Sequence, residues 1–134
     1  MILVAGATGV LGSEIVRRLL ARGEQVRAMV RATSKPASVE RLRHAGADIV
    51  VADLKEPDSL AAACRGVGSV ISSVSTIGTV QPCDSFEATD GHGTKALIDA
   101  ARNARVRKFV FVSFDTDVVP DAPLTRAIFD PYPV

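Results

Sequence analysis

The sequence predicts an α/β fold: a doubly wound parallel sheet of about five strands, with helices on both faces. Short apolar runs rich in β-branched residues alternate with longer segments of helical periodicity, as in consecutive βαβ units. The connections between these segments are short. A glycine-rich stretch also lies directly between the first apolar run and the first helical segment. We expect the strand order 3-2-1-4-5, in which the winding reverses between strands one and four.

The expected elements follow in order along the chain. Apolar runs predict five strands, over residues 1–5, 25–31, 48–53, 69–75 and 108–114. Helical periodicity predicts four intervening helices, over residues 11–23, 36–46, 56–67 and 85–106. The second helix begins at Pro36, which suits a first turn, and the fourth is strongest from Thr94 onward. The first three end at glycines, which commonly follow a helix C-terminus, namely Gly23, Gly46 and Gly66.

Three glycines lie three residues apart between the first strand and the first helix. Gly6 suits a tight turn whose backbone conformation is unfavourable for other residues. Gly9 would let a pyrophosphate approach the backbone, and Gly12 would let the helix pack closely against the sheet. The unpaired N–H groups at the helix start would face the phosphates. These expectations place cofactor contacts at Gly6, Thr8, Gly9, Val10, Leu11 and Gly12. The alternative is a tight βα turn without a ligand.

A second glycine-rich stretch, "GHGTKAL" at 91–97, is superficially similar to a P-loop. A P-loop needs four residues between its glycines and a lysine followed by serine or threonine. Here Thr94 precedes Lys95. We therefore expect Gly91 and Gly93 to form a turn before a helix, or to let the backbone approach the cofactor.

Four blocks together carry a family resemblance: "GATGVLGSEIVRRLLARG", "VRAMVR", "VVADLKEPDSLAAACRGVGSVIS" and "GHGTKALIDAARNARVRKFVFVS". In this order they resemble the NmrA-like, atypical short-chain dehydrogenase/reductase proteins, from Met1 to about Ser113. The resemblance implies an NAD(P)-binding Rossmann domain and leaves the reaction open.

The resemblance also implies roles for residues that follow two later strands. Asp53 and Leu54 would flank the adenine, although an aspartate after a strand is also an ordinary helix-entry residue. The segment from Ser73 to Thr76, which includes Ser75, would flank the nicotinamide ribose.

The residues after the second strand predict which dinucleotide binds. A domain that prefers NAD usually has an acidic side chain there for the ribose 2′-hydroxyl, whereas a 2′-phosphate needs positive charge. The sequence is "MVRATSK", with Arg31 and Lys35 and no acid. Arg31 can pair with a phosphate through two hydrogen bonds. NADP(H) is therefore favoured and NAD(H) stays open, and the alternative for both residues is a solvated basic loop.

Catalytic residues are harder to identify. Short-chain dehydrogenases typically use a tyrosine with a lysine four positions later, which lowers the pKa of the phenol. The single tyrosine, Tyr132, is followed by Pro133 and Val134, so this pair is missing. Ser113, at the end of the fifth strand, is a weak candidate for orienting a substrate, and a turn residue is the alternative. The sequence leaves open whether the chain is an enzyme.

Composition and charge argue against several classes of function. The net charge is +1 without a basic run, which argues against nucleic acid and anionic membranes as partners. No apolar run suits a membrane span or a signal peptide. Cys64 and Cys83 have neither metal-ligand nor redox spacing. We therefore expect a buried thiol at Cys64, no metal site and a cytoplasmic location.

We expect an NAD(P)-binding domain over 1–114 and a proline-rich tail over 115–134, the remnant of a C-terminal substrate region. The tail or a second copy of the chain, in a homodimer, would cover the exposed sheet edge. One function that fits is a reductase that transfers hydride from NADP(H) to a small carbonyl or quinone-like acceptor, a small-molecule substrate of unknown identity. Another is a non-catalytic module that senses NADP(H), or a truncated dinucleotide-binding module. A flavodoxin-like domain for a different phosphate ligand fits less well.

Overall fold

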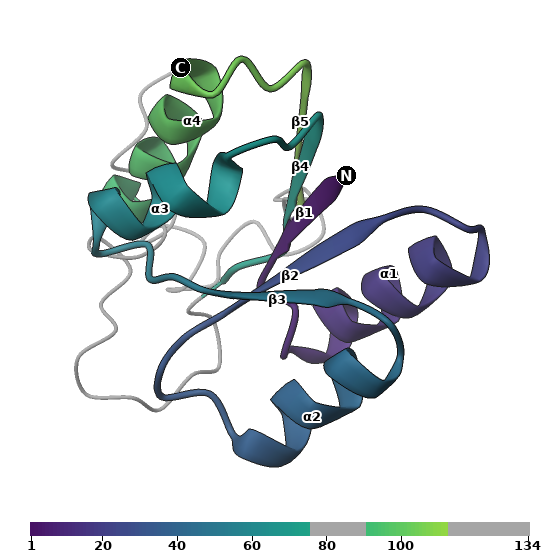
Figure 1. Ribbon diagram of the computed structural model, residues 1–134. Coiled ribbons are helices and arrows are strands. Elements are labelled where there is room, and N and C mark those ends of the chain that lie inside the picture. Colours follow the sequence, from purple (N-terminus) through teal and green to yellow (C-terminus); the bar gives the residue numbers. More distant parts are fainter. Residues whose placement is uncertain (76–90, 113–134) are drawn as a thin grey trace, which may run out of the picture.

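A parallel sheet forms the centre of the fold (Figure 1). The computed structural model describes residues 1–75 and 91–112. Within them the sheet has five strands in the order β3-β2-β1-β4-β5, and every neighbouring pair is parallel. The strands are β1 (Ile2–Ala5), β2 (Val26–Val30), β3 (Asp48–Val51), β4 (Ser69–Ser72) and β5 (Lys108–Phe111). The predicted fold class and strand order are confirmed.

A helix lies between each pair of consecutive strands: α1 (Val10–Ala21), α2 (Pro36–His44), α3 (Pro57–Cys64) and α4 (Thr94–Asn103). The first three end before their predicted limits, because the glycine turns lie outside them. Gly23, Gly46 and Gly66 have φ of 76°, 99° and 71°, a region that ends a helix. A π-helical turn over 91–93 precedes α4, which begins at Thr94. The predicted helical residues 85–90 lie outside the described residues.

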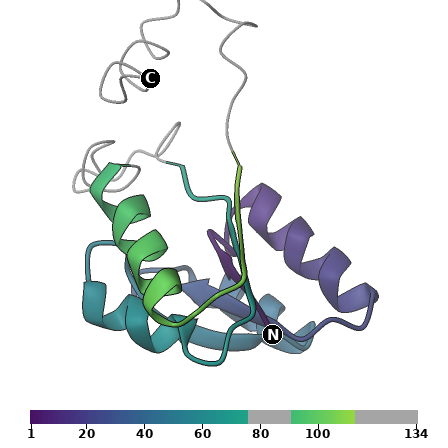
Figure 2. The same cartoon turned by 90° about the horizontal axis from the view of Figure 1, so that it is seen from above.

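Two helices cover each face of the sheet. Figures 1 and 2 show α1 and α2 on one face and α3 and α4 on the other. Because strand side chains alternate between faces, two separate apolar clusters form. Val4 and Val16 belong to the cluster under α1 and α2, whereas Leu3, Leu60 and Leu97 belong to the one under α3 and α4. The loops that follow parallel strands therefore lie together at one edge of this sandwich.

Arg27 of β2 anchors α3 to the sheet. Its Nη1 donates hydrogen bonds to Ala63 O at 3.1 Å and Arg65 O at 2.8 Å, and its Nε pairs with Asp48 at 2.9 Å. A cation suits these carbonyls because they form the negative end of the helix. The neighbouring Cys64 is fully buried, and burial raises the pKa of its thiol although the charge of Arg27 opposes that shift. The predicted burial of Cys64 is confirmed.

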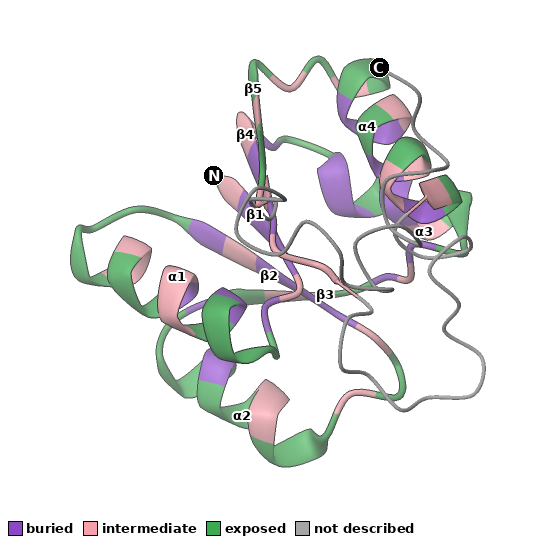
Figure 3. Cartoon of the chain, turned by 180° about the vertical axis from the view of Figure 1, so that it is seen from behind, coloured by how far each residue is buried: buried purple, intermediate pink, exposed green. Residues whose placement is uncertain are grey.

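β5 forms one edge of the described sheet. Its Val110 and Phe111 are 38% and 47% exposed, and Figure 3 shows the strand as largely exposed. The tail over 115–134, predicted to cover such an edge, lies outside the described residues. Cover by a second copy stays a prediction. None of the helices in the described part of the chain is long and apolar enough to cross a membrane.

Candidate functional site

The loop between β1 and α1 is a tight turn that leads directly into the helix. Gly6 follows β1 with a φ of 80°, which residues with side chains rarely adopt. The Gly9 N–H donates a hydrogen bond to Gly6 O at 3.0 Å and closes the turn. Gly9 O accepts from the Ser13 N–H at 2.9 Å, so Gly9 is the N-cap of α1. The turn conformation expected at Gly6 is confirmed.

Two of the three glycines are required by contacts within the protein. A Cβ on Gly12 would lie 2.0 Å from Gly6 O and 2.9 Å from Ser73 Oγ. A Cβ on Gly6 would also lie 2.9 Å from Ser73 Oγ. Real Cβ atoms do not approach other atoms so closely, so α1 packs against the loop only because both side chains are missing. Ser73 Oγ in turn donates a hydrogen bond to Ala5 O at 3.1 Å, which joins the end of β4 to β1.

Gly9 differs from the other two glycines. Its φ of −75° suits any residue, and a Cβ there would meet only Gly6 O, at 3.3 Å. No side chain caps α1, so the first N–H groups of the helix receive no side-chain acceptor. These groups and the positive end of the helix dipole fit a pyrophosphate in the open space beside Gly9. The chain's own residues therefore fit a dinucleotide here.

Exposed side chains surround this space. Val10 is 94% exposed and Leu11 is 50% exposed, so both present apolar surface beside the start of α1. Thr8 is also exposed and adds a hydroxyl group. Apolar surface with a few polar donors is typical of small-molecule sites. Cofactor contacts by these three residues stay predictions.

The loop after β2 carries the two predicted basic residues. The Arg31 N–H donates to Ser34 Oγ, and the Ser34 N–H donates back to Arg31 O, both at 2.9 Å. This turn leads to Lys35, the exposed N-cap of α2. Because β1 and β2 are adjacent and parallel, Arg31 and Gly6 follow their strands at the same sheet edge. Positive charge therefore borders the glycine loop, and a contact with a 2′-phosphate stays a prediction.

Asp53 makes the structural contacts of a helix-entry residue. Its carboxylate accepts from the Lys55 N–H at 2.9 Å, and its own N–H donates to Ser59 Oγ at 3.0 Å. This Asx turn leads the chain from β3 into α3. Leu54 is 5% exposed and belongs to the core. Contacts of both residues with an adenine stay predictions.

Residues after the fourth and fifth strands were predicted to lie near the nicotinamide. Ser73 and Ser75 do follow β4, but Ser73 Oγ is turned inward to Ala5 O. Ribose contacts by both serines stay predictions. Ser113 lies outside the described residues. The described residues hold no group of three or more His, Cys, Asp or Glu side chains that suits a metal ion.

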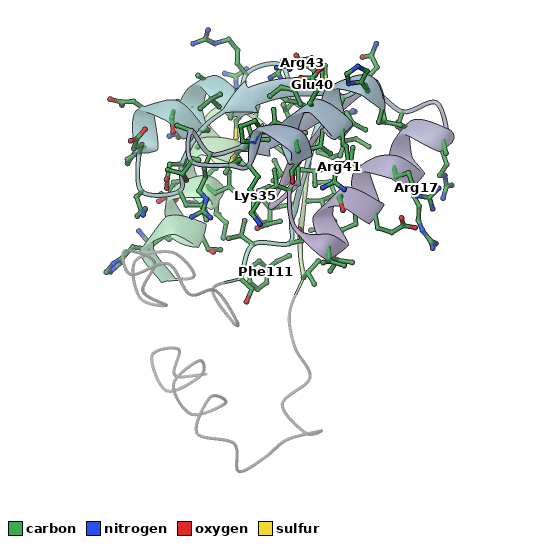
Figure 4. The ribbon with its side chains drawn as sticks, turned by 90° about the horizontal axis from the view of Figure 1, so that it is seen from below. Arg17, Lys35, Glu40, Arg41, Arg43 and Phe111 are labelled. Carbon is green, nitrogen blue, oxygen red and sulfur yellow. The ribbon has the colours of Figure 1, made fainter. Side chains whose placement is uncertain are left out.

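A pocket between α1 and α2 was missed by the sequence analysis. It has a volume of about 270 Å³, and its polar side chains include Thr8, Arg17, Ser38 and Arg41. The two arginines belong to different helices, so no local pattern relates them. In Figure 4 Arg41 lies between Arg17 and Lys35. Only the packing of α1 beside α2 brings this set together.

Glu14 of α1 also lines the pocket. It accepts two hydrogen bonds from Arg17 and one from Arg18, all at 2.7 Å. The bonds from Arg17, and then those from Arg18, lower the pKa of Glu14 to about 2. The carboxylate therefore stays ionised at neutral pH, and two arginines offset its single charge.

Comparison with known proteins shows what the chain is similar to. Residues 6–132 match the family model described as NAD(P)H-binding. An NADPH-dependent quinone oxidoreductase from Escherichia coli, solved with NADPH, is 25% identical with a TM-score of 0.74, over 97% of this chain and 42% of that one. A short-chain dehydrogenase/reductase superfamily protein from Agrobacterium tumefaciens, solved with NAD, is 32% identical with a TM-score of 0.67, over 90% and 34%.

Curated relatives extend this comparison. A photosystem II assembly factor from Cyanophora paradoxa is 41% identical over 93% of this chain and 38% of its own length. The chain spans between 24% and 39% of the length of these curated relatives. The matches therefore concern the domain described above, and the larger part of each of those proteins is not matched by this chain.

Proposed function

Because this chain belongs to the NAD(P)H-binding family, we propose that it binds NADP(H) across the carboxyl edge of its sheet. The pyrophosphate would lie beside Gly9 and the start of α1. The adenosine would extend toward β2 and β3, and the nicotinamide toward β4. This placement follows the reversal of winding between β1 and β4, where such sheets bind ligands.

The environment of Gly9 carries this proposal. Internal contacts explain why Gly6 and Gly12 lack side chains, but almost nothing in the described protein contacts the position of a Gly9 side chain. A glycine at this point is accounted for by a ligand that approaches the backbone. The uncapped start of α1 supplies N–H donors for an anionic group at the same place.

The preference for NADP(H) rests on Arg31 and Lys35. Arg31→Asp replaces the positive charge by a negative one, so NADPH should bind at least about tenfold more weakly while NADH changes little. Calorimetric titration of the wild type and the variant with each nucleotide, at one salt concentration, measures this. An equal loss for both nucleotides would remove Arg31 from the 2′-phosphate site.

The proposed reaction is hydride transfer to a small carbonyl or quinone-like acceptor. Similarity to a quinone oxidoreductase supports this reaction class. The bound coenzyme would supply the hydride, and the protein would orient it and exclude competing chemistry. Loss of NADPH absorbance on addition of a quinone, with purified chain, tests the proposal. Tight NADPH binding without oxidation by any of several quinones and aldehydes would count against it.

A non-catalytic module that senses NADP(H) is the second candidate. A relative that is 41% identical is named as a photosystem II assembly factor, which supports this candidate. The two candidates differ in turnover, so the same absorbance assay separates them. A cytoplasmic location and a homodimer across β5 complete the proposal, and light scattering on a sizing column tests the dimer.

A further inference from the structure

The pocket between α1 and α2 combines an apolar floor with a positive rim. Ala7, Val16 and Leu42 line it and are at most 5% exposed. Arg17 and Arg41 lie above this floor, one from each helix. Low-polarity walls reduce screening by water, so charges on such a rim interact more strongly with a ligand than charges on an open surface do.

Arg41 supplies positive charge that no carboxylate offsets. Its Nη2 donates one hydrogen bond, to Ser38 Oγ at 3.2 Å, and none of the described residues offers it a carboxylate within ion-pair distance. Across the pocket, Glu14 is shared between Arg17 and Arg18. The charged residues that line the pocket are Arg17, Arg41 and Glu14, which leaves an excess of one positive charge.

The charge distribution along the sequence agrees with this excess. Residues 10–44, which include α1 and α2, contain eight arginines and lysines but three glutamates, although the whole chain has 16 basic and 15 acidic residues. Of these basic residues, Arg17 and Arg41 line the pocket, and an excess of charge of one sign attracts ligands of the opposite sign.

Hydroxyl groups at the rim indicate which anion fits. Thr8 and Ser38 also line the pocket, Ser38 in contact with Arg41, and both hydroxyls can donate hydrogen bonds to an anion. A guanidinium with nearby hydroxyls suits a phosphate, since its fork can engage two phosphate oxygens at once. We propose that the α1–α2 pocket is a phosphate-binding site in which Arg41 binds the phosphate.

The phosphate group can come from two sources. Ala7 and Thr8 belong both to the pocket and to the loop that receives the dinucleotide, so the 2′-phosphate of NADP(H) is one source, and this source rests on the proposed function. A free phosphate is the other, and it does not depend on coenzyme binding. In the second case a phosphate and a dinucleotide occupy the protein together.

Arg41→Gln tests the site, with Arg43→Gln as the matched control. Arg43 lies on the same helix and pairs with Glu40, and two residues along a helix place it about 200° around from Arg41. Both variants lose one positive charge, but only Arg41 lines the pocket. Both arginines are exposed, so both variants should fold, which circular dichroism checks.

Each protein is titrated with inorganic phosphate at constant ionic strength, and binding is followed by the amide NMR signals of Thr8 and Ser38. NADPH and NADH are titrated by calorimetry in phosphate-free buffer. If the coenzyme is the source, Arg41→Gln weakens the binding of NADPH about tenfold or more and leaves the binding of NADH unchanged. In the wild type saturated with NADPH, added phosphate then causes no shift of the amide signals. If free phosphate is the source, added phosphate no longer shifts the amide signals of Arg41→Gln, whereas the variant keeps its affinity for NADPH. The wild type saturated with NADPH then still binds phosphate.

Equal behaviour of the Arg41 and Arg43 variants in every titration overturns the proposed site. Failure of the wild type to bind either nucleotide refutes the proposed function instead. The phosphate titration then tests the proposed phosphate site by itself, because its readout does not involve the coenzyme.

Discussion

Gly9→Ala should weaken nucleotide binding markedly while leaving the fold intact. Gly9 has φ of −75° and ψ of 169°, which alanine adopts without strain. The new Cβ would meet only Gly6 O, at 3.3 Å, so a shift of a few tenths of an ångström accommodates it. The added methyl group lies in the space that a pyrophosphate would need.

The expected change in stability is small. Alanine is a poorer N-cap than glycine, but it also restricts the unfolded chain, and the two effects oppose each other. The free energy of unfolding should change by less than about 1 kcal/mol. For the bound state, overpacking by one methyl group costs about 1–3 kcal/mol, which corresponds to roughly 5–150-fold weaker binding.

Gly12→Ala is the companion variant, and we expect its main effect on the stability of the fold rather than on the ligand space. Its Cβ would lie 2.0 Å from Gly6 O, whereas ordinary contact begins at 3.4 Å, so α1 or the loop must move by about 1.4 Å. Such a displacement should destabilise the fold by about 3 kcal/mol, a decrease in Tm of roughly 10 °C. Nucleotide binding should also fall, because the helix start moves away from the loop.

Urea unfolding and calorimetric titration with NADPH together measure both effects. Wild-type affinity in Gly9→Ala would refute the inference that a ligand occupies the space beside this residue. A Gly9→Ala variant that loses several kcal/mol of stability would show that the glycine serves the fold. In either case the interpretation of the loop as a pyrophosphate site would fail.

Three further changes test other contacts. Arg27→Met removes the hydrogen bonds to Ala63 O and Arg65 O and should lower the free energy of unfolding by about 2 kcal/mol in urea; a loss below about 0.5 kcal/mol would show that water replaces the guanidinium. Ser73→Ala removes the bond to Ala5 O and should cost about 1 kcal/mol in the same assay, whereas an unchanged midpoint would contradict a joining role for this hydroxyl. The Glu14 carboxyl should titrate near pH 2 by NMR, because Arg17 and Arg18 lower its pKa from an ordinary 4.5; its stabilising contribution is complete above pH 4.5 and is lost as the pH falls toward 2, and a midpoint near 4.5 would mean that these bonds do not persist in solution.

The fold class, the strand order and the approximate positions of the helices could be predicted from the amino-acid sequence. Strand and helix periodicities are local properties, and glycines such as Gly23 and Gly46 end helices through their own backbone freedom. The tight turn at Gly6 could be predicted for the same reason. The spacing of three glycines also predicts a dinucleotide site at this loop, because the motif lies within one short strand–turn–helix unit.

The separate roles of the three glycines, and the contacts between side chains distant in sequence, depend on the tertiary structure. Ser73 lies more than sixty residues beyond Gly6 in the sequence, yet it explains why Gly6 and Gly12 lack side chains. Asp53 accepts a hydrogen bond in the turn that leads into α3, and Arg27 donates one to the C-terminal end of the same helix. The pocket at Arg41 exists because α1 and α2 pack side by side on one sheet face. Such contacts join residues distant in sequence, and their geometry depends on how whole elements pack rather than on any local pattern.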